Sequence, residues 1–177
     1  MLELVCDAGV NYNRTGFGWC IIDNKKRTIE VKHHFYSKTV DIAISEFIAI
    51  ALCYSDASSR YNINGAKIYT DSTIAHNYLM FTGIKITKNK KNKDINDMLG
   101  NIKNILRNEN VSASYYKNGG KITVLTHKLC HNLASLNTMD AIDNDPNEKK
   151  LLDKYNSFIT STKNIIEVLE GQNFKVI

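Results

Sequence analysis

Apolar and polar residues alternate with a period of two along the first 36 residues of the chain. Residues 2–6 form a short apolar run, residues 16–22 alternate around glycines before becoming wholly apolar, and residues 28–36 alternate with charged positions. This period is typical of β-strands. Polar turns at residues 11–14 and 23–26 separate the three runs. We therefore predict that the chain begins with an antiparallel meander of three strands.

Beyond residue 40 the apolar positions take up helical spacing. This spacing predicts helices over residues 41–57, 73–81, 95–106 and 147–170, with a further helix beginning at Met139. Short apolar runs at residues 66–70 and 121–125 predict a fourth and a fifth strand. The fourth strand follows a helix, so we expect it to lie parallel to the first. The predicted architecture is an α/β fold with a five-stranded mixed sheet, three antiparallel strands then two parallel ones, and helices on both faces.

Composition adds only general limits. The chain has 177 residues, of which 43% are hydrophobic and 23% charged, as expected for a folded domain with its own core. The net charge of +5 suits a polyanionic partner without requiring one. The four cysteines are scattered without zinc-binding spacing, so we expect reduced core thiols. We find neither a signal peptide nor a membrane-spanning run, and we expect a soluble, cytoplasmic protein.

Four acidic residues stand where apolar elements begin or end, or on helix faces that should be buried. They are Asp7, Glu46, Asp71 and Asp140. An ionised carboxylate is costly in such surroundings unless a cation or hydrogen bonds stabilise it. Several carboxylates together repel one another, and a bound divalent cation relieves that repulsion. The pattern therefore indicates a metal site, although Asp7 in an Asx turn and Asp71 as a helix cap remain open as structural alternatives.

The order of the elements, with an acid in four of them, resembles ribonuclease H of type 1. Five local strings are similar to motifs of that family. They are Asp7-Ala8-Gly9 followed by Gly16-Phe17-Gly18-Trp19, then Ser45-Glu46-Phe47, Thr70-Asp71-Ser72, Thr126-His127, and Met139-Asp140-Ala141-Ile142. The resemblance covers residues 1–142. We expect residues 143–177 to form a C-terminal helical extension packed on the same domain.

The resemblance implies a ribonuclease H-like fold and a metal-dependent endonuclease. Such an enzyme cleaves the RNA strand of an RNA–DNA hybrid and leaves a 5′-phosphate. By the same resemblance, Asp7, Glu46, Asp71 and Asp140 would hold two Mg²⁺ or Mn²⁺ ions. Two such ions can activate the attacking water and stabilise the leaving oxygen. His127 would act as a proton shuttle.

The histidine and the fourth acid leave alternatives open. Asp140 lies thirteen residues after His127, whereas the family places its last acid about ten residues after the histidine. Asn137 occupies the ten-residue position. Either a longer loop over residues 128–137 accounts for the difference, or the register is shifted and His131 is the family-like histidine.

The substrate contacts are predicted from position alone. Asn11, Asn13 and Arg14, in the turn beside Asp7, could reach the minor groove of a hybrid and sense the 2′-hydroxyl, or they could form an ordinary solvated turn. A lysine-rich segment falls where the family carries a basic protrusion, and it is either a phosphate-binding element or a solvated face. The lysines in question are Lys88, Lys90, Lys91 and Lys93.

Further alternatives concern the whole molecule. The C-terminal helix either covers one face of the sheet or mediates a dimer or partner contact. A structure-selective nuclease of the same fold, such as a junction resolvase, would share the acids. A catalytically silent nucleic-acid-binding domain would have no need of them. The Gly-aromatic-Gly strand and the Thr-Asp-Ser turn favour the hybrid-cleaving branch.

Overall fold

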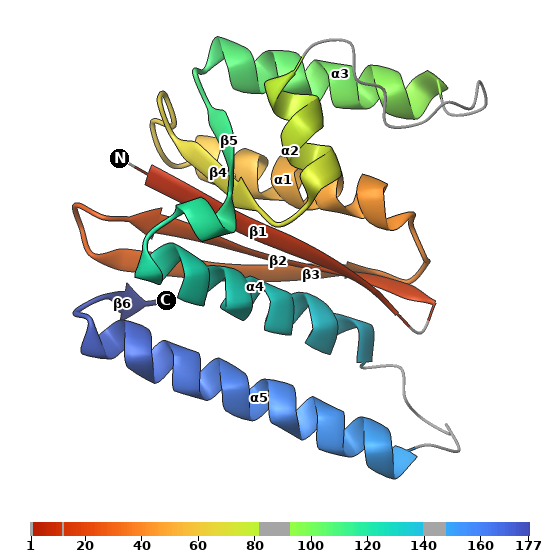
Figure 1. Cartoon of the computed structure of the whole chain (residues 1–177), viewed down its shortest axis with the longest axis vertical. Helices are drawn as coiled ribbons and strands as arrows, with labels where there is room; N and C mark the ends of the chain where they lie inside the picture. The colour runs from red at the N-terminus through yellow and green to blue at the C-terminus, as the bar shows by residue number, and fades with distance from the viewer. Residues whose placement is uncertain (1, 12, 82–92, 140–147) are drawn as a thin grey trace.

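A six-stranded mixed sheet forms the middle layer of the molecule. A computed structural model describes residues 2–11, 13–81, 93–139 and 148–177, and its strands follow the order β5-β4-β1-β2-β3-β6 (Figure 1). The first three strands are β1 (Leu2–Asn11), β2 (Arg14–Asp23) and β3 (Thr28–Tyr36), and they pair antiparallel as predicted. β4 (Lys67–Thr70) lies parallel to β1, as predicted from the helix that precedes it.

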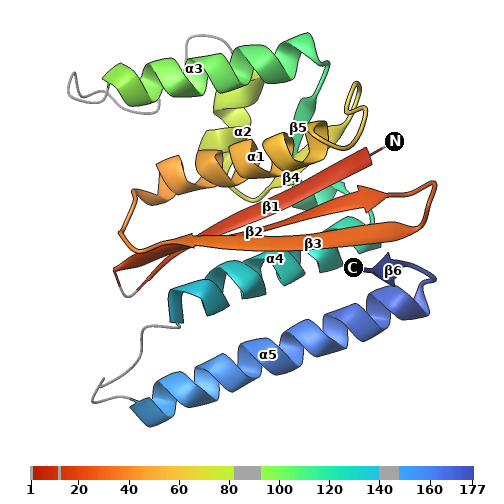
Figure 2. The ribbon, with the colours of Figure 1, turned by 180° about the vertical axis from the view of Figure 1, so that it is seen from behind.

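Helices cover both faces of this sheet. On one side lie α1 (Ile42–Ser58), α2 (Thr73–Met80) and α3 (Lys93–Asn108). On the other side α4 (Lys121–Met139) packs against β1 and β2, and α5 (Glu148–Gly171) packs on the outside of α4 (Figures 1 and 2). The predicted layers are confirmed. Within the described part of the chain, no helix combines the length and the apolar character needed to span a bilayer.

One predicted strand was wrong. Residues 121–125 form the first turns of α4, and the fifth strand is β5 (Ser112–Tyr115), parallel to β4. A short apolar run cannot by itself distinguish a strand from a buried helix. Here the apolar positions Ile122, Leu125, Leu129 and Leu133 continue at helical spacing and pack with the core between α4 and the sheet.

The sheet also has a sixth strand that the sequence analysis did not anticipate. β6 (Lys175–Val176) adds to the edge of β3 after α5. Earlier in the chain, the 3₁₀ turn Tyr116–Asn118 connects β5 to α4. The predicted helix start at Met139 was also wrong, because Met139 ends α4. The longer loop over residues 128–137, one of the two alternatives for the histidine spacing, is absent because these residues lie within α4.

The glycines of β2 let α4 approach the sheet closely. A Cβ atom on Gly16 would lie 2.0 Å from the Ala134 carbonyl oxygen, and one on Gly18 would lie 2.3 Å from that of Cys130. Both distances are far inside van der Waals contact. The side chain of Phe17, between them, packs in the core on the opposite face. In the Gly-aromatic-Gly string, the glycines therefore allow α4 to pack on one face of the sheet, and the aromatic side chain fills the apolar core on the other face.

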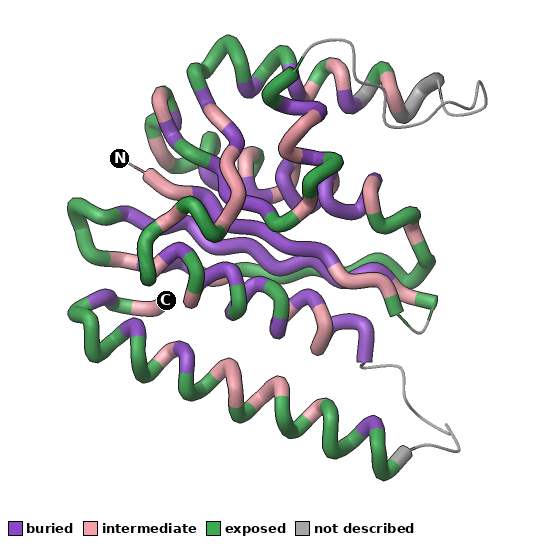
Figure 3. Tube along the Cα trace, viewed as in Figure 1, coloured by how far each residue is buried: buried purple, intermediate pink, exposed green. Residues whose placement is uncertain are grey.

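Burial is greatest where the central strands meet the two helix layers (Figure 3). All four cysteines are buried and free, as expected from their scattered positions. Several exposed residues of α5 face away from α4 (Figure 3). The inner side of α5 joins the core through Ile165 and Leu169. α5 thus covers α4 within the same chain, and no observation supports a dimer contact.

Candidate metal centre

The sheet register brings the first two acids side by side. Val5 of β1 pairs with Tyr69 of β4, and Asp7 and Asp71 each lie two residues further along, Asp7 within β1 and Asp71 just after the end of β4. Asp7 is buried, with its side chain 3% exposed, whereas the side chain of Asp71 is 42% exposed. The cluster therefore has one carboxylate in the protein interior and one at the surface.

The helix after β4 is capped by a neighbour of Asp71. The Ser72 hydroxyl accepts a hydrogen bond from the backbone N–H of Ala75, which satisfies a free donor of the first turn. Asp7 lies within β1 and not in an Asx turn. Both structural alternatives for these acids are therefore wrong, and their carboxylates are available to the cluster.

His127 reaches the two acids from the opposite helix. Its Nε2 atom lies 3.9 Å from Asp7 Oδ1 and 3.9 Å from Asp71 Oδ2. The ligand atoms of these three residues all lie within 4.8 Å of one another. The imidazole stacks on the Tyr116 ring, with centroids 4.0 Å apart and planes 16° from parallel. Tyr116 thereby fixes the orientation of the histidine ring.

His131 lies one helical turn further along α4 and contacts only one of the acids directly. Its Nδ1 atom forms a 2.9 Å hydrogen bond with Asp7 Oδ2, while its ring is largely exposed. This hydrogen bond raises the pKa of His131, because it stabilises the charged imidazolium beside a carboxylate. His131 therefore holds one oxygen of Asp7 while His127 faces the other.

Glu46, on α1, adds a third carboxyl whose charge interacts with those of Asp7 and Asp71. Burial raises the pKa of Glu46 to about 9, and the negative charges of Asp7 and Asp71 add to that effect. The backbone N–H of Ala8 donates a hydrogen bond that opposes the shift. Without a cation, the buried Glu46 carboxyl is therefore largely protonated at neutral pH.

Burial and neighbouring charges also shift the pKa values of Asp71 and His127. Burial and the charge of Asp7 raise the pKa of Asp71, against the opposing influence of His127 and His131. Burial lowers the pKa of His127, and the two aspartates oppose that shift. A neutral imidazole keeps a lone pair on one ring nitrogen, which is the form that binds a metal.

Two buried polar atoms of this cluster lack a hydrogen-bond partner among the described residues. They are Glu46 Oε2 and His127 Nε2. Buried polar atoms are rarely left unsatisfied, and each such case needs an explanation such as an ion or a water. A carboxylate oxygen and an imidazole nitrogen are both metal ligands, so these residues fit a divalent cation.

Asp140, predicted as the fourth metal ligand, lies outside the described residues. Met139, just before it, is twelve residues beyond His127 on α4, which corresponds to a rise of about 18 Å. Asn137, at the family-like spacing, is buried and donates weak hydrogen bonds to the carbonyl oxygens of Phe17 and His34. The described residues of α4 that face the aspartates are therefore two histidines, His127 and His131.

The predicted substrate contacts are dispersed. Asn11 and Arg14 pair at the end of the β1–β2 hairpin, and Asn13 has a positive φ of 58°. The Arg14 guanidinium lies over the exposed Phe35 ring, 5.2 Å from its centroid. Lys88, Lys90 and Lys91 lie outside the described residues, and Lys93 begins α3. Their phosphate contacts stay predictions.

Sequence reasoning missed the contribution of Tyr116 to this site. Tyr115 and Tyr116 precede an Asn-Gly-Gly turn, where aromatic side chains are usually assigned to sheet packing. Nothing in the local sequence indicates that one of them stacks on a histidine eleven positions later. If residues 121–139 had been recognised as a helix, His127 would have been placed near the start of that helix.

Comparison with solved structures identifies the fold. LC11-RNase H1, isolated from compost by a metagenomic approach, superimposes with a TM-score of 0.55 at 16% identity, covering 76% of this chain and 95% of that one. The chain has a ribonuclease H-like fold. The N-terminal RNase H domain of a Mycobacterium tuberculosis protein, solved as a fusion with maltose-binding protein, gives a TM-score of 0.55 at 12% identity. That match covers 80% of this chain and 99% of that domain.

A second structure of LC11-RNase H1 was solved in complex with an RNA/DNA hybrid. It gives a TM-score of 0.52 at 16% identity and covers 65% of this chain and 84% of that one. No protein-family model matches the sequence, and no curated protein matches it. The ribonuclease H-like fold that the sequence motifs implied is therefore confirmed by structure at low sequence identity.

Proposed function

We propose that this protein is a divalent-metal-dependent endonuclease that hydrolyses the RNA strand of RNA–DNA hybrids and leaves a 5′-phosphate. The observation that carries the proposal is the convergence of Asp7, Asp71 and His127 within 4.8 Å, on a ribonuclease H-like fold. The hybrid bound to LC11-RNase H1 supports the choice of substrate.

The metal-binding set that we propose differs from the one implied by sequence resemblance. Asp7, Glu46 and Asp71 keep their proposed roles. We add His127, because its Nε2 atom faces both aspartates and lacks a hydrogen-bond partner among the described residues, while Asp140 stays a predicted ligand outside those residues. When bound, two Mg²⁺ or Mn²⁺ ions would supply an activated water and charge stabilisation for the leaving 3′ oxygen.

The protein residues prepare this site in three ways. Stacking on Tyr116 holds the His127 ring in place, and burial favours its neutral, ligating form. The hydrogen bond from His131 fixes one Asp7 oxygen and leaves the other directed toward His127. The raised pKa of Glu46 favours the protonated carboxyl in the absence of a cation, so cation binding would release a proton from Glu46.

A substrate panel tests the proposal directly. Labelled RNA–DNA hybrid, duplex RNA, duplex DNA and a four-way junction are each incubated with and without Mg²⁺ or Mn²⁺. We expect cleavage of the RNA strand of the hybrid alone, dependent on the cation. Preferred cleavage of the junction would replace the proposal with a structure-selective nuclease. Binding without cleavage of any substrate would instead indicate a silent nucleic-acid-binding domain.

Matched variants test the residues. Asp71→Asn keeps the size of the side chain but removes its charge, so we expect hybrid cleavage to be abolished while the fold is retained. Asp97→Asn makes the same change at an exposed position on α3, away from the cluster, and should cleave as the wild type does. Wild-type turnover by Asp71→Asn at saturating cation would refute the metal assignment.

A further inference from the structure

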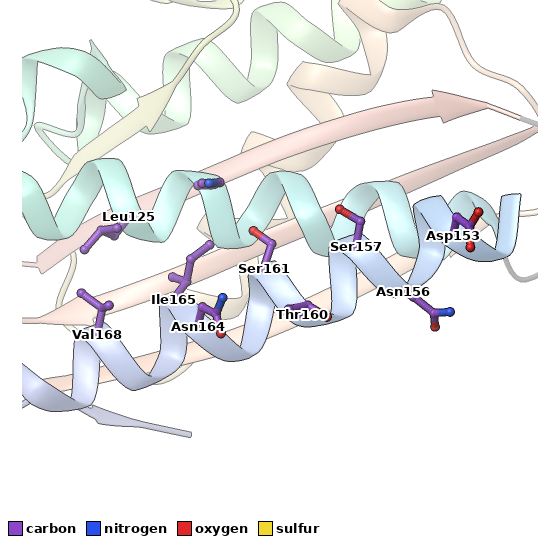
Figure 4. Close-up of a pocket in the computed structure, with 10 residues that line it drawn as sticks. Leu125, Asp153, Asn156, Ser157, Thr160, Ser161, Asn164, Ile165 and Val168 are labelled. Carbon is purple, nitrogen blue, oxygen red and sulfur yellow. The ribbon is translucent and has the colours of Figure 1, made fainter. Parts of the chain in front are cut away.

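Helix α5 borders a larger and a smaller cavity lined by described residues, and the smaller one adjoins the acid cluster. The larger, about 550 Å³, is an open groove between α4 and α5, into which Ser157 and Ser161 point (Figure 4). Its lining includes Asp153 and no residue of the acid cluster. The smaller, about 190 Å³, is more enclosed and lies between β1, α4 and α5.

The smaller cavity adjoins the metal centre through His131. This residue lines the cavity and also forms the 2.9 Å hydrogen bond to Asp7. His131 follows His127 by four residues on α4, a rise of about 6 Å. One strand of a duplex carries a phosphate about every 3.4 Å along the helix axis. The cavity therefore begins within one or two nucleotides of a phosphate held at the metal centre.

The chemistry of the cavity suits an anion. Its lining includes Lys154 from α5 and polar groups from Asn11, Ser135 and Thr138. Among the described residues that line it, none is a carboxylate. The Lys154 ammonium lies 6.0 Å from the centroid of the Phe158 ring, which in turn contacts His131 edge-on at 6.3 Å. These contacts place a permanent positive charge beside an aromatic surface.

We propose that this cavity is a phosphate subsite, where Lys154 binds the backbone of the substrate strand next to the scissile phosphate. The inference rests on the proposed nuclease function and adds a substrate contact from α5 that the sequence analysis did not identify. Phe158 provides an apolar surface for the adjoining sugar or base, as aromatic side chains do in single-strand binding sites. The C-terminal helix then has a function in substrate binding as well as in covering α4.

Binding measured without turnover tests the subsite separately from catalysis. Fluorescence anisotropy of a labelled RNA–DNA hybrid in EDTA, over a series of salt concentrations, gives both the Kd and its salt dependence. We expect Lys154→Gln to weaken binding by about fivefold, the effect of losing one exposed ionic contact. The slope of log K against log salt should fall by about 0.9, the loss of one phosphate contact on B-form DNA.

Two control variants define the result. Lys163→Gln removes the same charge from an exposed position on α5 outside the cavity, and should leave both quantities unchanged. Lys154→Arg keeps the charge and should retain the wild-type salt slope. Equal effects of Lys154→Gln and Lys163→Gln would overturn the subsite, as would a wild-type protein that binds no hybrid with or without cation.

A parallel cleavage assay separates the two proposals. If the wild type binds hybrid but cleaves no substrate, and Lys154→Gln still weakens binding, the nuclease proposal fails and the subsite stands. If the wild type cleaves hybrid and Lys154→Gln leaves KM and Kd unchanged, the subsite fails and the nuclease proposal stands. A raised KM with an unchanged kcat is the outcome that supports both, because Lys154 would bind substrate without contacting the reacting atoms.

Discussion

Helices α1 and α4 pack on opposite faces of the same sheet, but they bury different kinds of residues. The buried face of α1 is mostly apolar, with Phe47 and Ile50 in the core and Glu46 as its charged exception. The buried face of α4 includes Thr126, His127 and many other polar groups. A helix in the core can therefore carry buried polar groups beside its apolar stripe, when those groups contact a site and the glycines of β2 allow its close approach.

The largest expected effect tests Glu46, the charged group on the buried face of α1. Glu46→Gln should lower cleavage by about a thousandfold, because a neutral amide cannot stabilise cations as a carboxylate does. The wild-type Glu46 has a folded pKa near 9, above its ordinary value of 4.5. Its contribution to the stability of the metal-free protein is therefore lost as pH rises between those values, because the folded state binds the extra proton.

Glu46→Gln should remove this dependence, so that the metal-free variant has a higher Tm than the wild type at pH 8. Glu167→Gln, an exposed glutamate on α5, is the matched control and should change neither Tm nor activity. Thermal unfolding in EDTA at pH 5 and pH 8 provides the measurement. If the variant gains no stability at pH 8, Glu46 is not held in an uncompensated cluster.

The next effect tests the nitrogen ligand from α4. His127→Ala should lower kcat by about a hundredfold, as expected when a positioned imidazole is lost, and should largely spare hybrid affinity. His127→Asp should restore part of the activity with Mg²⁺ and reduce the advantage of Mn²⁺, because carboxylate oxygen suits Mg²⁺ better than imidazole does. The ratio of Mn²⁺- to Mg²⁺-supported rates measures this change.

The outcomes for the two histidines differ in kind. His131→Ala should cost less than His127→Ala, since His131 acts only by holding one oxygen of Asp7. His131→Asn can still donate a hydrogen bond, so it should recover activity relative to His131→Ala. If the Mn²⁺ to Mg²⁺ ratio of His127→Asp equals that of the wild type, His127 does not bind the metal.

A smaller effect is expected from the close packing of α4 on β2. Gly18→Ala should destabilise the fold by about 2 kcal/mol, since the new Cβ atom would lie 2.3 Å from the Cys130 carbonyl oxygen. Gly120→Ala places a methyl group where no heavy atom lies within 4 Å, and should stay within about 0.5 kcal/mol of the wild type. Urea unfolding of both variants measures the difference. Equal urea-unfolding midpoints would mean that α4 shifts at little cost to accommodate the added methyl group.

The difference between α1 and α4 also explains what the sequence could predict. The three-strand meander, α1 and the pair Asp7 and Asp71 follow from strong periodicity and from parallel register. Residues 121–139 were harder, because threonines, histidines and asparagines on the buried face of α4 obscure the apolar spacing of its leucines. The β-branched residues Ile122, Thr123 and Val124 then favoured a strand locally. Once that assignment was wrong, His127 was placed at a strand end, and its approach to both aspartates could not be recognised.

Contacts between residues distant in sequence also limited what could be predicted from the sequence. The stacking of Tyr116 on His127 and the approach of Lys154 and Phe158 to His131 depend on how α4 and α5 pack. No spacing in the sequence encodes those distances. The positions of Asp7, Glu46 and Asp71 were predictable because each follows or lies on an element of clear periodicity, whereas the contacts of Tyr116, Lys154 and Phe158 required the tertiary structure.

The smallest expected effect concerns the lysine-rich segment of the sequence, in contrast to Lys154 on α5. Replacing Lys88, Lys90, Lys91 and Lys93 together with alanine should raise KM several-fold and leave kcat nearly intact, since phosphate contacts position a duplex without touching the reacting atoms. Each lost contact should reduce the slope of log K against log salt by about 0.9 on a B-form duplex, with a similar order on a hybrid. Combining these changes with Lys154→Gln should reduce the slope additively, because the two groups would bind separate phosphates. An unchanged slope of log K against log salt in the quadruple variant would assign these lysines to a solvated surface. Lys154 on α5 would then remain as the proposed phosphate contact.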